Sequence, residues 1–415
     1  MRWVQGKWSF VALASVSALA VGVASRALGS PEASSPLPAA AIAHVATAPA
    51  PAVLIGDGSL EGQLDMATLR LDGEVFKAKL KGGGEAVLTL EPKLQAAAEN
   101  VLERAKAPLG AIVVTSVDGR VLAYAGRRNQ APAVERDFSL PAKVWAPAAS
   151  IFKVVTSAAL LSKGVAPDAK VCFHGGLRSV DPSHLVDNPR RDRNCESLSY
   201  GLAKSQNAII GKLAARHLNQ ESLRGFAKRF GFDQTMRFAL QAEANRCDIP
   251  KEPLELARTS AGFWNSELSP LGGAVLANTV ASGGLQVAPR IVAQVTRPDG
   301  ASMPVVGPAP RRVIDEKIAT DLASMMERAV SKGTARKGFH DRRGRPFLGD
   351  VKVAGKTGSL SRNEPYLAYS WFVGFAPADD PEVVISVLLG NPMKWHLKAH
   401  TAARLVLEDA FTKRH

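Results

Sequence analysis

The stretch Pro147-Ala148-Ala149-Ser150-Ile151-Phe152-Lys153 leads into an apolar run that ends near Gly164. Proline ahead of the run, Ala, Val and Leu at helical spacing and glycine behind it predict a buried helix with Ser150 in its first turn. The unpaired amide groups of a helix N-terminus stabilise a negatively charged oxygen. Lys153 follows one turn later on the same face, so its amine can reach the Ser150 hydroxyl. In apolar surroundings a neutral amine becomes accessible, and it can take the serine proton.

A second polar motif, Ser205-Gln206-Asn207, falls inside the predicted helical segment 200–213. Ser205 can relay a proton between a base and a leaving amine, and Asn207 offers both a donor and an acceptor to an amide substrate. Polar residues that cap a helix are the alternative interpretation. For the first motif, the alternative is a capping serine followed by a solvated lysine.

A third motif, Lys356-Thr357-Gly358-Ser359, follows a predicted strand over residues 351–355. A strand edge that ends in lysine and hydroxyl residues suits an extended peptide with a terminal carboxylate, and Gly358 leaves room for close backbone approach. Lys356 supplies a positive charge near Ser150, while Thr357 can bond the carboxylate. The Ser359 amide can serve as a second donor to an oxyanion. An ordinary strand end is the alternative for this motif taken singly.

The remaining apolar patterns predict helices layered on one sheet. We expect a hairpin over 110–125 with its turn at Asp118-Gly119, and three strands near the C-terminus. Because these strands come from both ends of the sequence, the fold class is mixed α/β (α+β). The predicted helices are 92–105, 202–213, 270–280, 314–330 and 400–411, and the predicted C-terminal strands are 350–355, 369–376 and 383–389.

The N-terminal part predicts export. Arg2 and Lys7 precede the uncharged apolar stretch 9–25, so residues 1–25 form a signal peptide or an uncleaved signal anchor, and we favour a membrane anchor over residues 8–25. Residues 26–53 are an Ala/Pro-rich linker. Residues 54–84 are expected to form a small appendage with one or two short strands, ahead of the main domain at 85–415.

Three cysteines leave alternatives open. Cys172 and Cys195 flank a polar loop, and in an exported protein a disulfide across it is plausible, with Cys247 left over. Free thiols are the second possibility. A zinc site that adds His174 and His184 to the same two cysteines is the third and least favoured. We therefore expect no metal and no cofactor.

The composition is that of a globular protein of 415 residues with 46% hydrophobic and 22% charged residues, and the net charge is +14. Basic clusters occur at 190–193 and 336–345. Export argues against nucleic acid as the partner, and an anionic membrane or cell-wall surface is the alternative to simple solvated loops. The sequence specifies no protein partner.

The three motifs, Ser150-x-x-Lys153, Ser205-x-Asn207 and Lys356-Thr357-Gly358, resemble those of the penicillin-binding and serine β-lactamase superfamily. The resemblance covers about Glu85 to the C-terminus and is greatest with the transpeptidase domain of penicillin-binding proteins. It implies a five-stranded antiparallel sheet flanked by helices, with a mainly helical subdomain that contributes Ser205 and Asn207. It also implies acyl transfer from D-alanyl-D-alanine stem peptides of peptidoglycan through Ser150, with β-lactams as covalent inhibitors.

Departures from the family pattern bear on the subfamily. Too little sequence precedes Glu85 for a glycosyltransferase domain, so we expect a monofunctional enzyme. Ala148-Ala149 replaces a Gly-Ser pair, and Glu243-Ala244-Asn245 lacks the spacing of a deacylating β-lactamase element. Asn207 favours the penicillin-binding side. A D,D-carboxypeptidase, a serine β-lactamase and a non-catalytic β-lactam-sensing or wall-binding protein remain alternatives to the D,D-transpeptidase.

Overall fold

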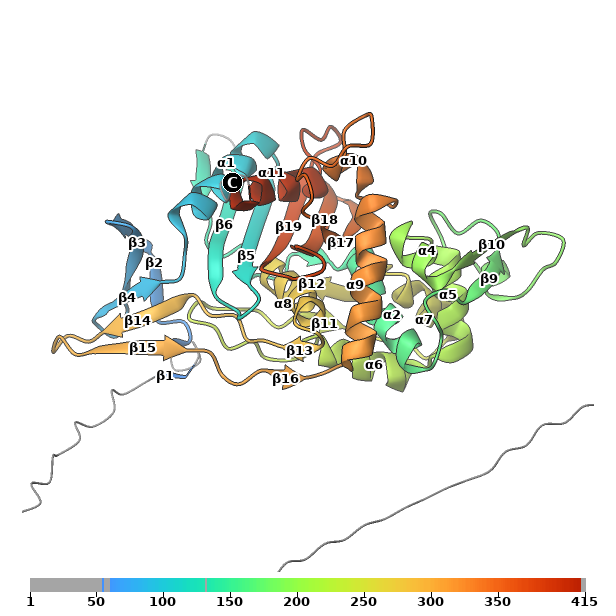
Figure 1. Ribbon diagram of the computed structural model, residues 1–415, viewed down its shortest axis with the longest axis horizontal. Helices are drawn as coiled ribbons and strands as arrows, with labels where there is room; N and C mark the ends of the chain where they lie inside the picture. The colour runs from blue at the N-terminus through green and yellow to red at the C-terminus, as the bar shows by residue number, and fades with distance from the viewer. Residues whose placement is uncertain (1–53, 56–59, 131–132, 412–415) are drawn as a thin grey trace, which may run out of the picture. The chain divides into compact units, whose positions relative to one another are not determined.

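A six-stranded antiparallel sheet is assembled from two distant parts of the chain. The structure, a computed structural model, describes residues 54–55, 60–130 and 133–411. The strand order is β17-β18-β19-β5-β6-β7, so the ladder between β19 and β5 joins the C-terminal strands to the N-terminal hairpin (Figure 1). The strands are β5 Leu109–Ser116, β6 Val121–Gln130, β7 Ala133–Arg136, β17 Ala354–Asn363, β18 Tyr366–Ala376 and β19 Val383–Asn391.

Helices cover both faces of this sheet, which explains why β19 is buried along its whole length. Alternate residues of a strand point to opposite faces. Accordingly Ile112 belongs to the core cluster formed with α1 (Pro92–Ala105) and α11 (Ala399–Phe411), while Val113 belongs to a different cluster. That second cluster includes residues of α8 (Pro270–Ala281), which contacts β18, β19 and β5.

A mainly helical subdomain packs beside the edge strand β17. Its central helix, α2, is buried except at its last residues, and α4, α5, α6, α7 and α9 surround it. Polar caps define the starts of these helices: Ser197 caps α4, and Asn219 forms a capping box at α6. The helices are α2 Phe152–Ser162, α4 Leu198–Ala203, α5 Asn207–His217, α6 Gln220–Arg229, α7 Pro253–Ser260 and α9 Glu316–Ser331.

A second six-stranded sheet combines residues 54–88 with residues 292–306. Its order is β1-β15-β14-β4-β3-β2, and its core cluster contacts Val113 and Tyr124 of the main sheet. The predicted appendage at 54–84 therefore pairs directly with strands of the predicted main domain. The strands are β1 Leu54–Ile55, β2 Leu64–Asp72, β3 Val75–Leu80, β4 Glu85–Leu88, β14 Val292–Thr296 and β15 Ser302–Val306.

Short elements complete the described part of the chain. They include three small sheets, β9 with β10, β8 with β12 and β11, and β13 with β16. Their bounds are β8 Ala146–Pro147, β9 Lys170–Phe173, β10 Asn194–Ser197, β11 Arg246–Cys247, β12 Ser266–Leu268, β13 Leu285–Gln286 and β16 Arg311–Arg312, and the short helices are α3 Pro182–Leu185 and α10 Arg336–Phe339.

The predicted fold class is confirmed, since one mixed α/β unit carries a sheet built from both ends of the chain. The predicted hairpin with its turn at Asp118-Gly119 forms as β5 and β6, and α1 has the predicted bounds. The short edge strand β7 extends the five strands that the family resemblance implies to six.

The strand predicted over 350–355 is wrong in its position. β17 begins only at Ala354 and continues to Asn363, so Lys356 and its neighbours lie within the strand and not after it. The reason is pairing: β18 offers partners for all ten residues of β17. Polar residues on an exposed edge, such as Ser359 and Arg362, lack the apolar alternation that marks a strand in sequence.

The predicted signal segment 1–25, its proposed anchor over 8–25 and the linker 26–53 lie outside the described residues. Within the part that the structure describes, the helices are all too short or too polar to cross a bilayer.

A disulfide joins Cys172 and Cys195, the directly paired residues of β9 and β10, and Cys247 is a buried free thiol. The disulfide prediction is confirmed. Because both sulfurs are committed to each other, they cannot serve the alternative zinc site.

Removal of this disulfide is expected to lower the free energy of unfolding by about 3 kcal/mol, because the crosslink closes a loop of moderate length in the unfolded chain. Denaturant titrations of the wild type and of Cys172→Ser/Cys195→Ser measure this. Reductant should destabilise the wild type and leave the double variant unchanged. Equal stability of the two proteins under oxidising conditions would refute the expectation.

Candidate active site

Ser150 lies in a single 3-10 turn, Ala149–Ile151, that feeds directly into α2. Ser150 therefore lies at the start of the helix as predicted, but in a 3-10 turn and not in the first turn of the α-helix itself. Ala149 adopts a left-handed conformation with φ 49°, which is unusual for a residue with a side chain. Gly262 packs against this turn so closely that a Cβ there would lie 2.1 Å from the Ala149 carbonyl oxygen. The turn that carries the serine is thus tightly confined.

Lys153 reaches back to Ser150 from the first turn of α2. Its Nζ lies 2.8 Å from the Ser150 Oγ and 2.8 Å from the Asn207 Oδ1, and it also donates to the Ala261 carbonyl. The side chain has no exposed surface. Burial first, and then the nearby charge of Lys356, hold the pKa of Lys153 well below its usual range.

The three partners of Lys153 also orient its amine. The Asn207 Oδ1 and the Ala261 carbonyl can only accept hydrogen bonds, so they take the two N–H groups of a neutral amine. The lone pair is then left facing the Ser150 hydroxyl, which can donate to it. This geometry is what a base for a serine hydroxyl requires.

Ser205 and Asn207 lie at a break between two helices, and not inside one helix as predicted. α4 ends at Ala203, Ser205 adopts a left-handed φ of 57°, and Asn207 is the first residue of α5. A residue in that conformation cannot continue an α-helix. The break turns the Ser205 hydroxyl toward Lys356 and the buried Asn207 side chain toward Lys153.

Lys356 is fully buried on β17 between the sheet and the helical subdomain. Its Nζ lies 3.1 Å from the Ser205 Oγ and 2.8 Å from the Thr357 carbonyl oxygen. Burial lowers the pKa of Lys356 to about 7. A Cβ at Gly358 would lie 3.3–3.4 Å from Ile151 and Ala148, so glycine lets the strand pack directly on the serine turn.

The predicted site residues meet at one cleft of about 760 Å³. The cleft is lined by Ser150, Ser205, Asn207, Thr357 and Ser359. Lys153 and Lys356 are buried and contact the hydroxyls of Ser150 and Ser205, and Gly358 is buried in β17. The structure therefore brings together all eight residues that the motifs single out.

Sequence reasoning missed several residues of the cleft. The Thr334 hydroxyl lies 2.6 Å from the Thr357 hydroxyl, and Trp264 lines the wall next to Gly262. The Ala261 carbonyl is a backbone partner of Lys153. Thr334 and Trp264 lie in segments without a recognisable motif. Every residue has a backbone carbonyl, so the residue type at position 261 could not indicate this contact.

The disulfide-closed hairpin supports Asn207. The Leu177 carbonyl accepts from the Asn207 side-chain amide at 3.1 Å, and the Gly176 carbonyl accepts from the Asn207 backbone N–H at 3.2 Å. Both carbonyls belong to the loop between β9 and β10, for which the sequence suggested a disulfide, candidate zinc ligands and a basic cluster but no contact with Asn207. The hairpin thus helps to hold Asn207 against Lys153.

A buried ion network ties this hairpin to α5. The Lys212 Nζ donates to the Cys172 carbonyl at 2.9 Å and to the Asp192 Oδ2 at 2.8 Å, and His174 contacts the same carboxylate. Burial opposes ionisation of Asp192, but hydrogen bonds from His174 and Lys212 outweigh it and hold the pKa of Asp192 below its usual range. Since Asn207 begins the helix that carries Lys212, the network restrains the position of Asn207.

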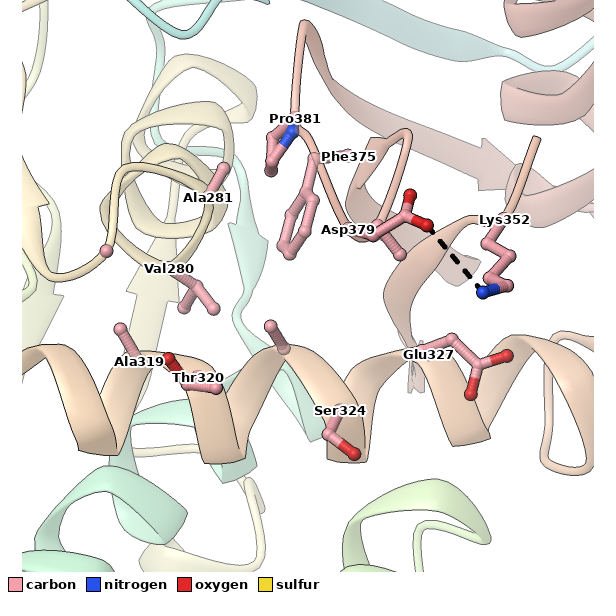
Figure 2. Close-up of a pocket in the computed structure, with 13 residues that line it drawn as sticks. Val280, Ala281, Ala319, Thr320, Ser324, Glu327, Lys352, Phe375, Asp379 and Pro381 are labelled. Carbon is pink, nitrogen blue, oxygen red and sulfur yellow. Dashed lines mark ion pairs between the residues drawn. The ribbon is translucent and has the colours of Figure 1, made fainter.

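A second pocket, of about 530 Å³, lies between α8, α9 and the turn after β18 (Figure 2). Its polar edge includes Glu327 and an ion pair of 3.6 Å between Lys352 and Asp379. None of the eight predicted site residues lines this pocket.

The Lys356 amine is expected to titrate near pH 7, because burial penalises its charged form. Lysine-selective NMR across pH 5–11 checks this, with Lys356→Met to assign the signal. Between about pH 7 and the ordinary lysine value, the unfolded chain holds a proton that the folded protein has released. This lysine should therefore make stability rise with pH in that window. A signal that titrates near pH 10 would contradict the expectation.

The chain is similar to several known proteins. Residues 109–408 match the family of the penicillin binding protein transpeptidase domain. The peptidoglycan D,D-transpeptidase PbpA of Mycobacterium tuberculosis is 28% identical over 354 residues, which cover 77% of this chain and 70% of that protein. The stage V sporulation protein D of Bacillus subtilis is 28% identical over 337 residues, covering 75% of this chain and 50% of that protein.

Solved structures agree in fold. Penicillin-binding protein A from M. tuberculosis, in a ceftriaxone acyl-enzyme complex, superposes with a TM-score of 0.66 at 24% identity, covering 79% of this chain and 80% of that chain. The D,D-transpeptidase domain of a peptidoglycan glycosyltransferase from Eggerthella lenta gives a TM-score of 0.65 at 24% identity, with coverage of 80% and 83%.

Proposed function

The chain belongs to the penicillin-binding protein transpeptidase domain family, and we propose that it is a serine D,D-transpeptidase of peptidoglycan stem peptides. The observation that carries the proposal is the buried Lys153 amine held between Ser150, Asn207 and the Ala261 carbonyl. The acyl-enzyme complexes reported for penicillin-binding protein A support an acyl-enzyme route, and they extend the proposal to β-lactams as covalent inhibitors.

In the acylation step, the Ser150 hydroxyl gives its proton to the neutral Lys153 amine as its oxygen attacks the carbonyl of the D-alanyl-D-alanine bond. The backbone N–H groups of Ser150 and Ser359 are the proposed donors to the resulting oxyanion. When the C–N bond breaks, the proton that Lys153 took from Ser150 passes through the Ser205 hydroxyl to the leaving D-alanine nitrogen. An ester on Ser150 and free D-alanine result.

In the second step, an amine of a neighbouring stem peptide attacks the ester. Its proton returns through the same groups, which restores the Ser150 hydroxyl. Thr357 and Ser359 are proposed to bond the terminal carboxylate of the donor, and Asn207 its amide. The charge of Lys356 adds to the binding of that carboxylate and to the relay through Ser205, with which it is hydrogen-bonded.

The location that fits this reaction is the outer face of the cytoplasmic membrane. The apolar N-terminal stretch supports export and a membrane anchor over residues 8–25. The proposal involves no metal and no cofactor, because the groups in the cleft supply nucleophile, base and proton relay.

Fluorescent penicillin is expected to label the wild type with a long-lived adduct and to leave Ser150→Ala unlabelled. Lys153→Arg should slow labelling by about 10²- to 10⁴-fold, because arginine stays protonated and cannot act as base. Ser162→Ala, at the far end of the same helix, is the matched control and should label normally. Persistent labelling of Ser150→Ala would show that another residue is the nucleophile.

Transfer and hydrolysis are separated by a donor pentapeptide that ends in D-alanyl-D-alanine, with an acceptor amine present. A transpeptidase should give a crosslinked product that increases with acceptor concentration, and Ser150→Ala should give none. Hydrolysed tetrapeptide alone, at every acceptor concentration, would identify a D,D-carboxypeptidase. Rapid loss of the penicillin label would identify a β-lactamase.

A further inference from the structure

Three cations border the cleft, and we call them the cationic rim: Arg178, Lys204 and Lys398. Each side chain is exposed and each lines the cleft. Within the residues that the structure describes, the lining of the cleft includes no aspartate or glutamate. His400 also lines it, but burial, and then the charge of Lys398, lower the pKa of His400 to about 4, so it is neutral at pH 7. The charge of the exposed rim is therefore wholly positive.

The rim lies on both walls of the cleft. Lys204 directly precedes Ser205, and its Nζ donates to the Lys332 carbonyl. Arg178 follows Leu177, the residue whose carbonyl holds Asn207. On the opposite wall, Lys398 directly precedes α11. The neighbouring Ala399 N–H donates to the Ser370 hydroxyl, and Ser370 pairs with Ser359 of β17. A peptide that extends along β17 would have cations on either side.

Among the described residues, no carboxylate pairs with any of these three side chains. The second pocket offers a contrast, because its lysine, Lys352, already pairs with Asp379 (Figure 2). Clefts lined by charge of one sign concentrate ligands of the opposite sign. The three cations of the rim are therefore available to pair with negatively charged groups of a bound ligand.

The terminal carboxylate of the donor peptide does not account for the cationic rim. Under the proposed function, that group is bonded by Thr357 and Ser359 and has the charge of Lys356 beneath it. We propose that the cationic rim selects donor stem peptides with a free internal carboxylate over peptides in which this group is a carboxamide. The inference rests on the proposed function, and it makes Arg178, Lys204 and Lys398 specificity-determining residues.

Binding to the Ser150→Ala protein tests the inference without any covalent step. The probes are pentapeptides ending in D-alanyl-D-alanine that carry a carboxylate or a carboxamide at the second or the third residue, varied one at a time. Because the second and the third residue are varied separately, the probes show which of the two carboxylates the rim binds. The wild-type rim should bind a carboxylate form about threefold to tenfold more tightly than its carboxamide, and this preference should shrink at high salt.

Neutralisation of the rim locates the effect. Arg178→Gln, Lys204→Gln and Lys398→Gln should each weaken binding of the carboxylate peptide by about two- to fivefold. The triple variant should bring the carboxylate and carboxamide affinities close to equal. Lys394→Gln removes an exposed charge from the same loop as Lys398 but outside the cleft lining, so it should keep the full preference.

Penicillin labelling of the same variants on a wild-type Ser150 background separates the two proposals. Equal binding of carboxylate and carboxamide peptides by the protein that keeps all three rim cations, together with intact penicillin labelling, would overturn the inference and leave the proposed function standing. A preference that survives in the triple variant would also overturn it. A preference for carboxylate that disappears in the triple variant supports it, even in a protein that fails to acylate.

Discussion

Burial of the Lys153 amine is the constraint on which the site depends. An ammonium without exposed surface would need a carboxylate partner, yet its partners are a hydroxyl, an amide oxygen and a backbone carbonyl. The neutral amine satisfies these partners, and it is the form that can accept a proton from Ser150. The surrounding structure supplies that environment: α2 brings the lysine into the core, the break before α5 aims Asn207, and the edge strand β17 closes the cleft.

Much of the fold could be predicted because apolar periodicity reflects burial. α1 and the hairpin of β5 and β6 bury strongly patterned faces, and their sequences showed this. β17 could not be placed correctly, since its pairing with β18 determines where it begins and its exposed residues are polar. Short strands were expected within residues 54–84, and β2 and β3 form there, but their assembly into a second sheet was beyond prediction. Its strands come from residues 54–88 and 292–306, and no local pattern reports pairing over such a distance.

For the site, the sequence predicted which residues carry reactive groups, because serine, lysine and asparagine side chains can be identified directly from residue type and spacing. It did not predict how they are held. Ala261 and Leu177 act through backbone carbonyls, which every residue has, so their identities reveal nothing. The left-handed conformation of Ser205 is likewise a result of packing between two helices, where the residue pattern had favoured one continuous helix.

The ladder between β5 and β19 has a consequence for biosynthesis. β19 ends at Asn391, and it lies between the C-terminal strands and the N-terminal hairpin. Ribosomes add about 5–20 residues each second, so the first hairpin must wait for tens of seconds before its neighbour is made. A nascent chain would therefore expose the β19-facing edge of β5 unpaired, and the active site could not assemble until β17 and β19 had been synthesised.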